Sequence, residues 1–172
     1  MISAISDERG QASAIEMSSM SFAIVDEYKD TVYRTALTVT GNFADAEDIT
    51  QEVFLKYFQL RPEFETKSHE KAWLLRVTIN SGKNLLRTFW HSRRGEIDLS
   101  QIPQPEKQKH PEVLQAVLGL PEKYRIAIYL YYYEEYSIQE IAEITGHSKA
   151  VVSQHLSRGR AKLRKKLGGD KV

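Results

Sequence analysis

The chain of 172 residues carries a net charge of only +1, and its 41% hydrophobic and 27% charged residues are typical of a soluble globular protein. It contains no cysteine, which excludes disulfides, thiolate catalysis and cysteine metal ligands and fits a reducing compartment. No apolar run approaches the roughly 20 residues of a membrane span, and the first residues lack the pattern of a signal peptide, so we expect a cytoplasmic protein without membrane insertion.

The N-terminal part of the chain contains one clear helical pattern. Residues 1–20 show no apolar period and are predicted to be a loose extension. From about Ser21 to Thr40, hydrophobic side chains recur at spacings of three and four, which is typical of an amphipathic helix that faces a core. These side chains are Phe22, Val25, Tyr28, Val32, Ala36 and Val39. Gly41 is expected to end the helix.

Two further helices are predicted before residue 94. The second starts after Asn42, whose side chain can cap it, and ends before Pro62. Its apolar stripe consists of Ala46, Ile49, Val53, Tyr57 and Leu60. The third is capped by Ser68, and its stripe consists of Ala72, Leu75, Ile79, Leu86 and Phe89. Another face of the third helix carries Arg76, Asn80, Lys83, Asn84 and Arg87. Trp73 is interpreted as a core residue, whereas Phe89 and Trp90 fit either a buried or a DNA-facing position.

The apolar period fails between Arg94 and His110, where proline and polar residues predominate, so residues 95–110 are predicted to be a flexible linker. The linker separates a helical domain over residues 21–94 from a second over residues 111–172. The second domain opens with Val113 to Leu118, followed by a helix that Pro121 starts and by two helices over Ser137 to Thr145 and Lys149 to Leu167.

The last two helices have the layout of a helix-turn-helix. Ile138, Ile141 and Ile144 would bury the first helix, Ala142 allows a close crossing, Gly146 permits a left-handed turn and Ser148 caps the second helix. Val151, Val152, Leu156 and Leu163 would hold the second helix down. Toward solvent this leaves Lys149, Ala150, Ser153, Gln154, Ser157 and Arg158, while Arg160, Arg164 and Lys165 suit phosphates. We therefore predict an all-α protein of two small helical domains, the C-terminal one a helix-turn-helix.

Charge is divided unevenly between these segments. Residues 22–66 contain four basic and nine acidic side chains, residues 67–94 contain seven basic and one acidic, and residues 147–167 contain seven basic and none acidic. Two basic blocks indicate two surfaces that face nucleic acid, and the acidic segment leaves a surface for a protein partner.

Four motifs in this order resemble the extracytoplasmic-function (ECF) sigma factors of bacterial RNA polymerase, over about Ser21 to Leu167. Residues 45–54 (DAEDITQEVF) look like the family's region 2.2, and residues 71–80 (KAWLLRVTIN) look like its regions 2.3 and 2.4. Residues 120–125 (LPEKYR) and 137–142 (SIQEIA) resemble region 4. The resemblance implies a sigma factor that directs promoter recognition, melting and initiation for a stress or envelope-response regulon.

The resemblance also implies partners and site residues. The chain would bind core RNA polymerase, on its beta-prime clamp and beta flap, as well as promoter DNA and an anti-sigma factor. Docking on the clamp is carried over to Asp48, Gln51, Glu52, Phe54 and Leu55. Contacts to the minus-ten element are carried over to Phe64, Lys67, Ser68, Arg76, Asn80, Lys83, Asn84 and Arg87, with the loop 64–69 holding a flipped-out base. Contacts to the minus-thirty-five element are expected from Lys149, Ala150, Ser153, Gln154, Ser157, Arg158 and Arg160.

The sequence departs from the family pattern in the recognition helix. Two bases that the family commonly carries are replaced here by Ser153 and His155. We therefore expect a base preference in the upstream element that differs from that of other members.

Two other classes of function were weighed. A helix-turn-helix regulator that binds duplex operators without polymerase would explain the C-terminal motif, but it would leave the acidic block and the basic third helix unexplained. An enzyme such as a nuclease needs a convergent acid cluster or a phosphate loop, whereas Asp45, Glu47 and Asp48 point in different directions from successive helix positions. No metal-ligand spacing occurs in the sequence either, so we expect a non-enzymatic protein without cofactor or metal.

Overall fold

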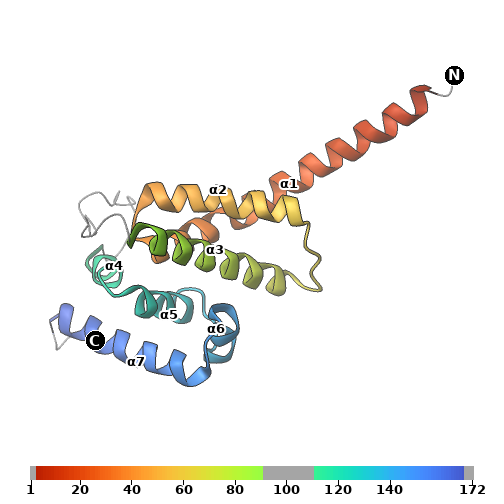
Figure 1. Cartoon of the computed structure of the whole chain (residues 1–172). Helices are drawn as coiled ribbons and strands as arrows, with labels where there is room; N and C mark the ends of the chain where they lie inside the picture. The colour runs from red at the N-terminus through yellow and green to blue at the C-terminus, as the bar shows by residue number, and fades with distance from the viewer. Residues whose placement is uncertain (1–2, 91–110, 169–172) are drawn as a thin grey trace.

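A computed structural model describes residues 3–90 and 111–168, with side chains placed for residues 22–88 and 112–168. Regular structure in these ranges is helical throughout: α1 (Ser3–Thr40), α2 (Phe43–Leu60), α3 (Lys67–Trp90), α4 (Pro111–Leu118), α5 (Glu122–Tyr132), α6 (Ile138–Thr145) and α7 (Lys149–Lys166). Figure 1 shows α1–α3 as one bundle and α4–α7 as a second group beside it. The predicted all-helical, two-domain fold is confirmed. The predicted linker and the side chains of Phe89 and Trp90 lie outside the described residues.

Helix α1 begins at Ser3, so the predictions of a loose extension and of a helix start at Ser21 were wrong. Figure 1 shows the first half of α1 projecting away from the other helices. The prediction depended on an apolar stripe, and a helical segment that packs against no neighbour has no stripe to show.

The N-terminal domain buries one face of each helix. Its core consists of Tyr28, Val32 and Ala36 from α1, Ala46, Ile49, Val53 and Phe54 from α2, and Leu74 from α3. The predicted stripes are buried except at their ends, because Phe22 and Leu60 are 70% and 68% exposed. At Gly82 the helices α1 and α3 approach closely, since a Cβ atom there would lie 2.5 Å from Cγ1 of Val39.

Local side chains set the ends of these helices. The Oδ1 atom of Asn42 accepts a hydrogen bond of 3.0 Å from the backbone nitrogen of Asp45, as predicted for the start of α2. Helix α3 is capped by Thr66 and not by the predicted Ser68, because the Oγ1 atom of Thr66 accepts from the backbone nitrogen of His69 at 3.2 Å. The chain enters α3 at Lys67, so Ser68 already lies inside the first turn.

The C-terminal domain contains the predicted helix-turn-helix in α6 and α7. Ser137 and Glu140 form a capping box at the start of α6, Gly146 ends it at φ 69°, and the hydroxyl of Ser148 caps α7. Val152 and Leu156 are buried, but Val151 is 36% exposed, so its predicted role in holding α7 down was wrong. Successive helical residues are rotated by about 100°, and the buried side of α7 is centred on Val152.

Candidate nucleic-acid interface

The acidic face of α2 is open to solvent. Asp48, Gln51 and Glu52 are exposed, and Leu55 beside them is 60% exposed. Phe54 is only 7% exposed and belongs to the core, so its side chain is not available for the contact that the sequence suggested. A hydrogen bond from Lys56 lowers the pKa of Glu52, which keeps this carboxylate charged. The face therefore offers acids and an amide around a single large apolar side chain.

A hollow of about 310 Å³ lies where the loop after α2 meets the start of α3. Its lining comprises Tyr57, Pro62, Phe64, Glu65, Thr66, Lys67 and Glu70. The rings of Tyr57 and Phe64 are stacked with their centroids 6.4 Å apart, and Trp73 lies 5.9 Å from Phe64. Two of the predicted minus-ten residues, Phe64 and Lys67, therefore meet in one aromatic-lined hollow, and Ser68 is exposed next to Lys67.

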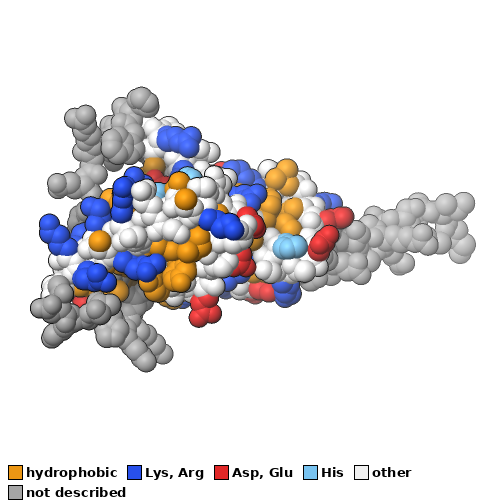
Figure 2. All heavy atoms as spheres, turned by 90° about the horizontal axis from the view of Figure 1, so that it is seen from below, with side chains coloured by type: hydrophobic (Ala, Val, Ile, Leu, Met, Phe, Trp, Pro, Cys, Tyr) orange, Lys and Arg blue, Asp and Glu red, His pale blue; other side chains and the backbone are white. Residues whose placement is uncertain are grey.

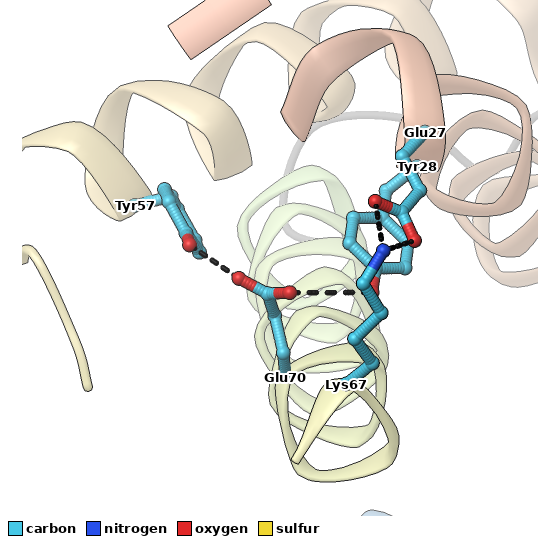
Figure 3. A network of polar contacts seen from close by, with 5 residues as sticks. All are labelled: Glu27, Tyr28, Tyr57, Lys67 and Glu70. Atoms are coloured by element: carbon cyan, nitrogen blue, oxygen red, sulfur yellow. Dashed lines mark hydrogen bonds and ion pairs between the residues drawn. The ribbon is translucent and has the colours of Figure 1, made fainter. Parts of the chain in front are cut away.

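A single carboxylate connects the three helices around this hollow, as Figure 3 shows. One oxygen of Glu70 accepts a hydrogen bond from the hydroxyl of Tyr57 in α2, and the other accepts from Tyr28 in α1 at 3.2 Å. Burial and the charge of Glu70 raise the pKa of Tyr28 to about 12, so its hydroxyl stays protonated and can donate. Lys67 forms an ion pair of 2.7 Å with Glu27 of α1. These contacts fix the entry of α3 against α1 and α2.

The basic face of α3 is divided between solvent and the C-terminal domain. Asn80, Asn84 and Arg87 are exposed. The Nη2 atom of Arg76 donates a hydrogen bond of 2.5 Å to the carbonyl oxygen of Glu143 in α6. Lys83 lines a small cavity together with residues of α5 and α7. Five predicted minus-ten residues therefore share this helix, and two of them are engaged within the protein.

The outer face of α7 is strongly basic. All seven residues that the sequence assigned to the minus-thirty-five element are exposed: Lys149, Ala150, Ser153, Gln154, Ser157, Arg158 and Arg160. Figure 2, which views the molecule from the side of α7, shows many Lys and Arg side chains and few acidic ones on its C-terminal domain. The guanidinium of Arg160 also lies over the rings of Tyr131 and Tyr132, at 5.9 Å from each centroid.

Comparison with known proteins settles the family. The model of Sigma-70 region 2 matches residues 24–92, and that of Sigma-70, region 4 matches residues 110–163. The ECF RNA polymerase sigma factor SigW of Bacillus subtilis is 30% identical over 162 residues, which cover 84% of this chain and 87% of that protein. The chain belongs to the ECF family of RNA polymerase sigma factors. SigE of Mycolicibacterium smegmatis is 33% identical over 157 residues, but the match spans only 59% of that protein.

Two solved structures share the fold of this sigma factor. The sigma factor RpoE in its complex with the anti-sigma factor NepR from Bartonella quintana aligns over 87% of this chain and 97% of its own, with a TM-score of 0.73 and 22% identity. CnrH in complex with the cytosolic domain of CnrY aligns over 90% and 91%, with a TM-score of 0.64 and 21% identity. Together with the family matches, these findings confirm the predicted resemblance, and they place the chain among non-enzymatic transcription factors.

Sequence reasoning missed two residues of this sigma factor that shape the hollow, Tyr57 and Glu70. Tyr57 was assigned only to the apolar stripe of α2. A signal for Glu70 was present, because it is the only acid among residues 67–94, and an isolated acid in a basic segment often has a structural partner. Among the residues that the structure describes, no helix has the length and hydropathy to cross a membrane, and no cluster of His, Asp and Glu could hold a metal ion.

Proposed function

We propose that this sigma factor binds the core of bacterial RNA polymerase in the cytoplasm, directs it to promoters of a stress or envelope-response regulon and helps to melt them. The observation that carries the proposal is the presence of three differently charged surfaces on one chain: an acidic face on α2 and basic faces on α3 and α7. A regulator that binds operators without polymerase needs only the last of these.

Docking on polymerase is assigned to α2. The exposed Asp48, Gln51 and Glu52 would face basic residues of the beta-prime clamp, and Leu55 would supply the apolar anchor. Charged rims mainly steer the encounter of two proteins, whereas a desolvated apolar side chain contributes more of the affinity. The C-terminal domain would contact the beta flap, and an anti-sigma factor would compete for these surfaces.

Reading of the minus-ten element is assigned to α3 and to the hollow at its start. Asn80 and Asn84 can hydrogen-bond to unpaired bases, and Arg76, Lys83 and Arg87 can contact phosphates. A base that leaves the stack loses stacking energy, and an aromatic-lined hollow such as the one between Phe64 and Tyr57 can replace part of it.

Reading of the minus-thirty-five element is assigned to α7. Ser153 and Gln154 occupy adjacent exposed positions near the start of the helix, where a recognition helix contacts base edges. Lys149, Arg158 and Arg160 supply positive charge for phosphates on either side.

The test is transcription in vitro from genomic fragments with bacterial core polymerase, with and without this chain. Specific transcripts that appear only when the chain is present are the expected result. Specific binding to duplex DNA with no polymerase-dependent transcript would instead support an operator-binding regulator, and it would overturn the proposal.

A further inference from the structure

The two domains of this sigma factor pack directly against each other. Val39 of α1 and Leu75 and Ile79 of α3 are fully buried, and they belong to one hydrophobic cluster with Leu120, Tyr124 and other residues of the C-terminal domain. The close neighbours across this boundary are α1 with α5 and α3 with α6. The hydrophobic stripe of α3 therefore has part of its partner surface in the other domain.

Arg125 of α5 fixes this arrangement from within. Its side chain is 2% exposed, and its guanidinium donates to the carbonyl oxygens of Thr38 and Val39 in the last turn of α1. A third hydrogen bond of 2.6 Å goes to the carbonyl oxygen of Leu118. The last carbonyl groups of a helix lack intrahelical donors and carry partial negative charge, so a buried cation from the other domain satisfies them.

Polar contacts continue along the rim of the same boundary. Lys71 of α3 forms an ion pair of 2.7 Å with Glu134, whose side chain is only 7% exposed. Arg34 of α1 donates to the hydroxyl of Tyr133 at 3.1 Å, and its guanidinium lies 5.7 Å from the centre of that ring. These contacts join both long helices of the N-terminal domain to the segment that follows α5.

The boundary overlaps the face of α3 that was assigned to the minus-ten element. Arg76 spends a donor on the carbonyl oxygen of Glu143, and Lys83 is enclosed beside His147 and His155. Asn80, Asn84 and Arg87 remain exposed on the adjacent side. The C-terminal domain and a promoter strand would therefore compete for the same edge of α3.

The packed arrangement is also too short for a promoter. The two elements, whose names place them roughly 25 base pairs apart, are separated by about 85 Å along B-form DNA, whereas a domain of this size has a radius of gyration of about 11 Å. The 20 residues at positions 91–110 could reach about 70 Å when extended, so separated domains could span the distance.

From these observations we propose that the docked arrangement is a self-inhibited state, in which the C-terminal domain covers the Arg76 edge of α3 until the two domains separate. The inference rests on the proposed function of α3. The acidic face of α2 stays exposed in the docked arrangement, with Asp48 and Leu55 open to solvent. A chain that is held closed should therefore still bind core polymerase but should not initiate transcription.

Because the natural chain has no cysteine, a tether can test this directly. In the variant Arg34→Cys with Tyr133→Cys, the two exposed positions are joined by a bis-maleimide that has a cleavable disulfide spacer. Excess reagent is removed before polymerase is added, and each single-cysteine variant is treated in the same way. We expect efficient cross-linking in the free chain, at least about tenfold less transcription by the tethered chain, retained competition for core polymerase and recovery after the spacer is reduced.

A charge swap provides a second, tether-free arm. Lys71→Glu and Glu134→Lys each place like charges at the boundary and should slow the cross-linking several-fold, whereas the double reversal should restore it. The matched control is Lys29→Glu, because Lys29 pairs with Asp26 on its own helix and not across the domains.

Each outcome has a distinct meaning. Failure of the free chain to cross-link, or full transcription by the tethered chain, would overturn the inference. If the unmodified chain itself gave no transcript, the proposed function would fail, whereas docking would still be measured by the cross-linking rates. Loss of both core binding and transcription that the single-cysteine variants share would report damage by the substitutions, and in that case the charge swap decides.

Discussion

The Nη2 atom of Arg125 donates a hydrogen bond of 2.7 Å to the carbonyl oxygen of Val39, in a site where the arginine is 2% exposed. Burial lowers the pKa of Arg125 to about 10, so the side chain still carries its charge at neutral pH. A buried cation of this kind is tolerated only because carbonyl oxygens from two helix ends surround it.

Arg125→Met should destabilise the protein by about 2–4 kcal/mol, because three buried carbonyl groups lose their donor. Urea unfolding of the full chain measures the change. Arg34→Met serves as the control, since Arg34 is exposed and its loss should change the unfolding free energy by less than about 1 kcal/mol. Equal effects of the two substitutions would contradict the role given to the buried cation.

Gly82→Ala should destabilise the protein by about 1–3 kcal/mol, although alanine is normally the better helix former. The added methyl group would lie 2.5 Å from Cγ1 of Val39, so α1 and α3 would have to move apart. Thermal unfolding measures the change, and Gly82→Ala combined with Val39→Ala should recover part of the loss. An increase in melting temperature for the single variant would show that the two helices have more room than described.

Asp48→Lys combined with Glu52→Lys should weaken binding to core polymerase at least about tenfold and leave the helical content unchanged. Both side chains are exposed on α2, so charge reversal alters the surface and not the core. The measurement is a binding titration with core enzyme. Asp30→Lys, at an exposed position of α1, is the matched control, and a similar loss for that variant would mean that only net charge is being sensed.

Asn80→Ala should impair open-complex formation more than closed binding. The substitution removes hydrogen bonds to an exposed base and removes no charge, so the electrostatic part of binding is retained. Permanganate footprinting reports melting, and a mobility assay at low temperature reports closed binding. Normal permanganate reactivity at the minus-ten element would exclude Asn80 from this role.

Gln154→Ala and Arg158→Ala should separate sequence reading from phosphate contact. Glutamine pairs well with adenine, so the first variant should lose discrimination at one A·T pair, by about 1–3 kcal/mol. The second should weaken binding to all sequences and flatten the salt dependence. Holoenzyme is titrated against single-base variants of the upstream element at several salt concentrations. If the two patterns were exchanged, the orientation of α7 in the groove would be wrong.

Local structure followed the sequence wherever one helix face alternates with solvent. The stripes predicted α2, α6 and α7, and the caps at Asn42 and Ser148 were predicted from their side chains. Errors occurred where local chemistry permitted two answers: Thr66 and Ser68 both carry a hydroxyl suited to a cap. Phe54 was assigned to a surface by resemblance, although it lies one position from Val53 on the buried side of α2.

The docking of the two domains could not be predicted in the same way. Periodicity shows that Leu75 and Ile79 are buried, but it does not show against which element. Arg125 gives no signal either, because a charged residue within an apolar run is most simply explained as solvent-exposed. Only the placement of α5 against the end of α1 shows why this position carries a guanidinium.

Glu70 places a negative charge on the helix that is assigned to promoter DNA, where it repels an approaching phosphate backbone. The same carboxylate holds hydroxyl groups from α1 and α2 on its two oxygens. Neutralising it would bring α3 closer to a polyanion in electrostatic terms and at the same time loosen the junction that shapes the hollow beside it. The affinity of this domain for DNA is therefore bounded by its own architecture, and a tighter-binding domain would first need another way to hold its three helices together.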